Sequence, residues 1–320
     1  MLNAAKNADY KNPVESAMLM RVGGEGTGYG RYWHGYQMFL RPLLVFIDIV
    51  KIRWLNYALF LLLIAYSSLL MLKRLSKGVA LSWLATLLII NFHIVPHCMQ
   101  FSCCFYIAII SMIVILKFDK LTESTQRALC LFFIIGSLTS FFDLLTTPTV
   151  TLGLPLAILL LKNGKQKTLI KQIVCLSLSW GIGYVFLWIS KWGVEYLLTG
   201  VNIFEEAKTQ VEYRLGGDMG DAYSNLLRIV YSFSMSLSAC ILFVSWLFWK
   251  YCNKNALLKN SYLLIIAMIP FFWFIVVHQH SITHFLFTWR SFTVSIFCIF
   301  VYISKTISMN RLVNSTSEKL

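Results

Sequence analysis

Long apolar segments, separated by short charged connections, limit this chain to a few kinds of fold. Nine such segments occur, at residues 55–72, 79–96, 101–117, 128–146, 148–161, 173–190, 227–249, 262–279 and 287–304. Most have the roughly 17–25 residues that a helix needs to cross a bilayer. Soluble domains carry about 25% charged residues, whereas this chain carries 13%. The pattern excludes a soluble protein and predicts an all-α, polytopic membrane helix bundle of about nine transmembrane helices, with interfacial helices on its outer side.

The fifth segment is the shortest of the nine and begins at Pro148. A broken or re-entrant segment is therefore an alternative to a full crossing at this place.

The basic residues are distributed unevenly between the connections. The net charge is +14, from 28 Lys and Arg against 14 Asp and Glu. Every second connection is basic, and these connections with the C-terminal tail hold 16 basic and 3 acidic residues, or +13. Short cytoplasmic loops collect Lys and Arg, so we expect this side and the C-terminus to be cytoplasmic. The excess charge then indicates topology, and a nucleic-acid partner is not expected.

The chain divides into an extracytoplasmic or interfacial segment, residues 1–54, and a transmembrane bundle, residues 55–320, with an outer loop at about 191–226. Residues 31–53 predict a pair of interfacial helices broken at Pro42, and residues 202–215 predict a small outer helix. Because the first 50 residues lie outside in this topology, we expect a transmembrane helix to precede Met1. A short tail that crosses unaided is the alternative.

Asp143 is the only carboxylate within any of the predicted spans, near the outer end of segment 128–146. An ionisable side chain at membrane depth is costly and suggests a functional site. Asp143 could act as a general base, bind a metal or orient a sugar hydroxyl. It could also be a structural residue that pairs with an arginine or caps the next helix.

All six histidines map to the predicted outer half. His93 and His97 are four residues apart, as are His280 and His284, a spacing that permits metal binding on a helix. Neither pair has an acidic partner in its motif, which favours polar lining or phosphate contacts. No cofactor is expected, and a divalent metal stays an alternative.

Two further motifs bring cations next to aromatic rings. Residues 31–36 contain Arg31, Trp33, His34 and Tyr36, and Arg290 follows a tryptophan near the outer end of the last span. The aromatic residues fit a membrane-interface belt. They equally fit a carbohydrate or lipid-phosphate platform, with Arg31 or His34 on the phosphate. Arg290 either extends to the lipid headgroups or clamps a phosphate.

Together, the sequences RYWHGY at 31–36, FLRPLL at 39–44, SFFDLLT at 140–146, TLGLPL at 151–156 and HFLFTWR at 284–290 resemble GT-C-type integral membrane glycosyltransferases of bacterial surface-polysaccharide loci. The resemblance implies a polyprenyl-phosphate-linked sugar donor and transfer at the outer face. It also implies a catalytic carboxylate in the first outer loop. Residues 1–54 contain no neighbouring pair of acidic residues, only Asp9, Glu15, Glu25 and Asp48.

We therefore expect a membrane glycosyltransferase of the cell envelope, with Asp143 and His34 as catalytic candidates. The candidate substrate-binding residues are Arg31, Trp33, Tyr36, His280, His284 and Arg290. The expected partners are a lipid-linked sugar, membrane lipids and other polysaccharide-assembly proteins. A polysaccharide polymerase or ligase is the nearest alternative. A lipid-linked glycan flippase or transporter is another, although it predicts polar residues across the full membrane depth.

Overall fold

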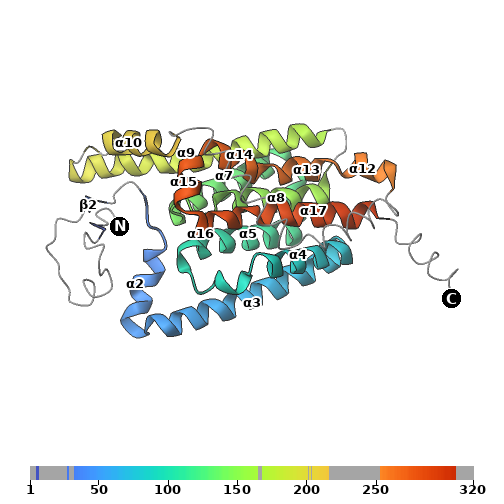
Figure 1. Cartoon of the computed structure of the whole chain (residues 1–320), viewed down its shortest axis with the longest axis horizontal. Coiled ribbons are helices and arrows are strands. Elements are labelled where there is room, and N and C mark those ends of the chain that lie inside the picture. The colour runs from blue at the N-terminus through green and yellow to red at the C-terminus, as the bar shows by residue number, and fades with distance from the viewer. Residues whose placement is uncertain are drawn as a thin grey trace.

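The computed structural model describes residues 5–6, 27–28, 32–164, 168–200, 202, 204–215 and 253–307. These residues are almost entirely helical (Figure 1). Two short strands, β1 (Ala5–Lys6) and β2 (Thr27–Gly28), pair antiparallel. The predicted all-α fold is confirmed for the described part of the chain.

Several of the described helices are long and apolar enough to span a membrane. They are α3 (Ile49–Arg74), α7 (Thr125–Phe142), α9 (Leu169–Thr199) and the segment Phe285–Thr306, which contains α16 (Phe285–Thr288), η3 (Trp289–Phe292) and α17 (Thr293–Thr306). A fifth span arises if α12 (Lys254–Asn260) and the helical segment Tyr262–Val276, which meet at a 48° bend, cross as one unit. The chain thus has the composition of a multi-pass membrane protein. The predicted span 227–249 lies outside the described residues.

Shorter helices complete the bundle. Their bounds are α2 (Gln37–Phe46), α4 (Lys77–Ile89), η1 (Phe92–Ile94), α5 (Met99–Lys117), α6 (Asp119–Glu123), α8 (Pro148–Asn163), α10 (Phe204–Leu215), α13 (Tyr262–Ala267), α14 (Ile269–Val276) and α15 (His278–Thr283). Helix α10 confirms the small helix predicted at 202–215.

Helix α8 is the central element of the bundle. Every residue from Pro148 to Leu160 is buried, because the helix is apolar on all sides and other helices surround it. Pro148, at the first helical position, costs no internal hydrogen bond, and the helix continues through the interior Pro155 with the loss of one. Segment 148–161 therefore forms one continuous helix.

Helices α7 and α9 pack through glycines. A Cβ atom built on Gly136 would overlap the carbonyl oxygen of Trp180, and one on Gly183 would overlap the carbonyl oxygen of Phe133. The close approach also lets the Ser137 hydroxyl donate to the Gly183 carbonyl at 3.1 Å. Small residues that bring helix backbones together are a common means of association between membrane helices.

Several span boundaries differ from the prediction, and two of the differences have a clear cause in the backbone. The segment predicted at 79–96 leaves the α-helix after Ile89, because Asn91 adopts a left-handed conformation with φ of 52°. Conversely, the segment predicted to end at residue 190 continues as α9 to Thr199, where Gly200 takes a left-handed C-cap with φ of 70°. Glycine and asparagine are the residues that adopt this backbone conformation most readily.

The predicted break at Pro42 is also wrong. Helix α2 runs through Pro42, and the chain turns instead at residues 47–48. An interior proline removes one helical hydrogen bond without always ending the helix. Asp48 provides the stronger signal, because its side chain accepts a hydrogen bond from the Lys51 N–H at 2.9 Å and caps α3.

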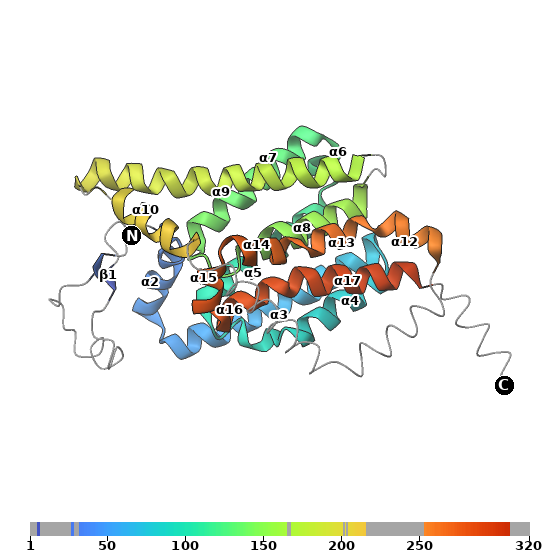
Figure 2. The ribbon, with the colours of Figure 1, turned by 45° about the horizontal axis from the view of Figure 1, so that its top comes forward.

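The bundle has two chemically different ends. Helices α6 and α12 and the end of α17 lie at one end, whereas α2, α10, α15 and α16 lie at the other (Figures 1 and 2). At the first end, Asp119 forms ion pairs with Lys162 at 2.6 Å and Arg74 at 3.6 Å. The hydrogen bond and charge of Lys162 lower the pKa of Asp119. Three basic connections that are separated in sequence therefore meet at one end.

The α7–α9 contact predicts opposite effects for two substitutions in one helix. Gly183→Ala should destabilise the protein by about 1–3 kcal/mol, because the added methyl group meets backbone that cannot easily move. Gly181→Ala, with no atom within 4 Å of its Cβ, should be neutral or stabilise by up to about 1 kcal/mol through helix propensity. Thermal unfolding of the purified variants in detergent measures both. Equal midpoints would contradict the close packing.

Candidate functional site

Asp143 organises the turn that joins α7 to α8. Its Oδ2 atom accepts a hydrogen bond from the Thr146 N–H at 2.9 Å, and its Oδ1 atom accepts one from the Thr146 hydroxyl. Leu145, inside the turn, has φ of 64°, a conformation that costs energy for a side chain of this size. The Asp143 side chain is 1% exposed. Its carboxylate therefore holds the turn in this conformation, and both oxygens are engaged.

Helix α15 lies against the same turn. The His280 ring donates through Nε2 to the carbonyl oxygen of Leu145 at 2.7 Å. This donation requires a proton on Nε2. The His284 ring lies 4.8 Å from that of His280 and stacks on Phe287 at 5.2 Å. The two rings are close, although α15 ends at Thr283 and His284 is the N-cap residue of α16. His280 links α15 to the Asp143 turn.

The aromatic segment at 32–36 docks on the end of α7. The Gly35 N–H donates to the Phe141 carbonyl at 2.9 Å, and a Cβ at Gly35 would overlap the Phe141 ring. Trp33 donates through Nε1 to the Leu187 carbonyl of α9 at 2.6 Å. His34 has φ of 54° and its Nδ1 lies 3.3 Å from the Tyr36 hydroxyl. The segment is thus fixed to both α7 and α9, next to Asp143. Arg31 lies outside the described residues.

Arg290 is buried in η3. Its side chain is 4% exposed, its Nη1 atom donates to the Leu286 carbonyl at 2.8 Å, and its guanidinium lies 4.8 Å from the centre of the Trp289 ring. The ring face stabilises the cation. The side chain folds into the protein in this structure and does not extend to its surface.

His93 and His97 do not share a helix, contrary to the prediction, because His93 is in η1 and His97 follows in a turn. His97 packs against the rings of Trp54 and Tyr57, at 6.0 and 5.5 Å. Within the described ranges, no three or more His, Cys, Asp or Glu side chains gather closely enough to hold a metal ion.

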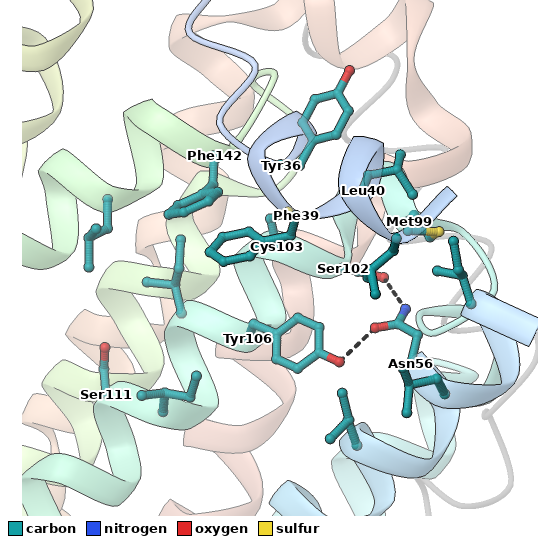
Figure 3. A pocket seen from close by; sticks show the side chains of 17 residues that line it. Tyr36, Phe39, Leu40, Asn56, Met99, Ser102, Cys103, Tyr106, Ser111 and Phe142 are labelled. Carbon is teal, nitrogen blue, oxygen red and sulfur yellow. Dashed lines mark hydrogen bonds between the residues drawn. The ribbon is translucent and has the colours of Figure 1, made fainter. Parts of the chain in front are cut away.

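An apolar pocket of about 530 Å³ opens between α2, α3, α5 and α7 (Figure 3). Tyr36, Phe39, Cys103 and Phe142 line it near the aromatic segment. Phe142 directly precedes Asp143. Cys104 follows Cys103, and its Sγ atom lies 3.9 Å from the Thr146 hydroxyl that donates to Asp143. The pocket therefore lies next to the Asp143 turn, although Asp143, Cys104 and Thr146 do not line it.

The polar groups of the pocket satisfy one another. The Asn56 amide donates to the Pro96 carbonyl at 2.6 Å and to the Ser102 hydroxyl at 3.3 Å, and it accepts from the Tyr106 hydroxyl at 2.6 Å. Figure 3 shows this group at one side of the pocket. The remaining surface is almost wholly apolar, which suits a hydrocarbon chain.

A buried ion pair was missed from the sequence. Lys191 and Glu195 are 0% and 3% exposed and bind each other within α9. The spacing of four residues is the available signal, but the predicted span ended at residue 190. The same part of α9 bears Trp188, which stacks on Tyr32 at a centroid distance of 6.4 Å. The pair thus adjoins the helix turn on which the aromatic segment docks.

No family model, curated protein or solved structure matches the chain.

The buried pair predicts non-additive substitution effects. Lys191→Met alone leaves a buried carboxylate without its partner and should destabilise the protein by about 3–5 kcal/mol. Lys191→Met combined with Glu195→Leu removes both charges and should recover most of that loss. Thermal unfolding of single and double variants completes the cycle. Purely additive losses would contradict a coupled pair.

Proposed function

We propose that the chain is a membrane glycosyltransferase of GT-C type that uses a polyprenyl-phosphate-linked sugar at the outer face of a bacterial membrane. Its product is a new or modified surface glycan. The observation that carries the proposal is the closeness of the apolar pocket to the Asp143 turn, because Phe142 and Cys103, which line the pocket, are the chain neighbours of Asp143 and of Cys104, which contacts Thr146. The pocket accommodates part of the lipid chain, while the polar side chains beside it receive the phosphate and sugar.

The proposed topology has about nine spans and a cytoplasmic C-terminus. The meeting of three basic connections at one end supports it, because such connections stay in the cytoplasm. The aromatic segment, the Asp143 turn and α15 then lie on the outer side, together with residues 1–54.

The proposed reaction joins an acceptor hydroxyl oxygen to the anomeric carbon as the bond from that carbon to the phosphate oxygen breaks. Asp143 accepts the hydroxyl proton or orients the acceptor, and His34 is the second acid–base candidate. Arg31 stabilises the departing polyprenyl phosphate. Arg290 is buried in this structure, so its side chain must become accessible to do the same. Trp33, Tyr36, His280 and His284 contact the sugar or the phosphate. Since both Asp143 oxygens bind Thr146, the turn must open for Asp143 to reach a substrate.

Two substitutions separate the chemical role of Asp143 from its role in the turn. Asp143→Asn keeps a side-chain oxygen for the Thr146 N–H but cannot take a proton, so the surface glycan should be lost at normal protein levels. Thr146→Val removes only the hydroxyl bond and should retain most of the glycan. Glycan staining with immunodetection of the protein measures both, and Glu205→Gln, which alters an exposed carboxylate of α10, is the control.

Unchanged glycan in Asp143→Asn and in Arg290→Ala, with normal protein levels, would contradict the assignment. A change of glycan chain length would indicate a polymerase instead. Accumulation of lipid-linked glycan in vesicles without bond formation would indicate a flippase.

Filling the pocket tests the site of the lipid chain. Leu59 lines the pocket, whereas Leu62 lies on the same helix, is 67% exposed and does not. Leu59→Trp should raise the KM for the lipid-linked donor at least about tenfold, because the indole takes the volume of several methylene groups worth about 0.8 kcal/mol each. Leu62→Trp should leave it unchanged. Equal KM values in the two variants would place the lipid elsewhere.

A further inference from the structure

A second cavity, of about 550 Å³, lies at the basic end of the bundle. Residues of α6, α7, the end of α8 and the beginning of α9 line it. Figure 2 shows these helix ends at the end of the bundle opposite to α2. The floor of the cavity is apolar and includes Leu129 and Leu176, and its rim is polar and includes Glu123, Thr125 and Lys171. This amphipathic lining differs from the almost wholly apolar pocket beside Asp143.

One side of the cavity favours an anion. Helices α7 and α9 both begin at it, and neither has an acidic residue in its first turn. At the start of α7, Ser124 makes no side-chain cap. The N-terminal N–H groups of helices and their dipoles attract negative charge. Lys171 and Thr125 also line the cavity and add an ammonium and a hydroxyl as donors, so a phosphate fits here.

The cavity also holds acceptors that a simple anion leaves unused. Glu123 lines it and forms no ion pair with another residue in the described part of the chain. The Gln172 amide donates through Nε2 to the Thr168 hydroxyl at 3.2 Å, while its Oε1 atom is buried and has no partner among the described residues. The Glu123 carboxylate and the Gln172 amide oxygen both accept hydrogen bonds, and a protonated amine can donate to both.

The position of the cavity along the membrane normal indicates where its ligand comes from. It contacts the first turns of α7 and α9, two of the candidate membrane spans. The ends of spanning helices lie at the level of lipid headgroups, and basic pockets between such helices bind headgroups.

We propose that this cavity binds one phospholipid whose headgroup carries a phosphodiester and a primary ammonium, the chemistry of phosphatidylethanolamine. The phosphate lies at Lys171 and the two helix N-termini, the ammonium at Glu123 and the Gln172 Oε1 atom, and an acyl chain on Leu129 and Leu176. The proposal rests on the membrane location of the chain and is independent of the proposed glycosyl transfer.

Lipid competition on the purified full chain tests the site. Native mass spectrometry from detergent with equal amounts of phosphatidylethanolamine, phosphatidylglycerol and phosphatidylcholine should show preferential retention of phosphatidylethanolamine. Glu123→Gln should lower the retention of phosphatidylethanolamine relative to phosphatidylglycerol by up to about fivefold, because exposed ion pairs contribute about 1 kcal/mol at most. Lys171→Gln should lower the retention of both lipids. Both side chains are exposed, so the fold should be retained.

The matched controls are Glu205→Gln and Lys208→Gln, exposed residues of α10 at the other end, which should keep the wild-type preference. Equal retention of the three lipids, a wild-type preference in Glu123→Gln, or wild-type amounts of retained lipid in Lys171→Gln would overturn the proposal. Displacement of the lipid by water-soluble phosphoethanolamine at equal concentration would also overturn it, because the ligand would then come from solution.

Discussion

Backbone hydrogen bonding inside a bilayer is the constraint on which the rest of this structure depends. A lipid environment offers no partner to an N–H or C=O group, so each spanning segment must be helical. Irregular backbone is confined to the helix ends, and there the described chain has its unusual conformations, at His34, Asn91 and Leu145. Two of these three lie beside the candidate site. The chemistry proposed for this protein therefore takes place at the ends of helices, where the backbone is irregular.

The apolar pattern was sufficient to predict the helical bundle, because membrane helices are recognised by length and composition. It predicted boundaries less well. A left-handed Asn91 shortened α4, a backbone choice that hydropathy does not report. Lys191 and Glu195 suggested a loop, yet their mutual ion pair allows the helix to continue with both charges buried. Pro42 suggested a break, but the cap formed by Asp48 determined where the chain turns.

The residues of the candidate site could be predicted from the sequence, but the contacts between them could not. Sequence spacing correctly placed His280 near His284, and charge alternation correctly separated the basic connections from the histidine-bearing elements. Neither pattern could show that His280 donates to the Leu145 carbonyl, or that Gly35 packs against Phe141, because these contacts join segments far apart in sequence. The lipid-sized pocket was missed for the same reason. Its walls come from four helices, none of which is unusual alone.

The account requires that the two ends of the bundle face opposite sides of the membrane. Labelling with a membrane-impermeant thiol reagent tests this most directly, with modified positions identified by peptide mass. Thr283→Cys in α15 and Lys120→Cys in α6 place thiols at exposed positions of opposite ends. The account predicts that Thr283→Cys reacts in intact cells and Lys120→Cys only after permeabilisation. The reverse pattern, or reaction of both in intact cells, would contradict it.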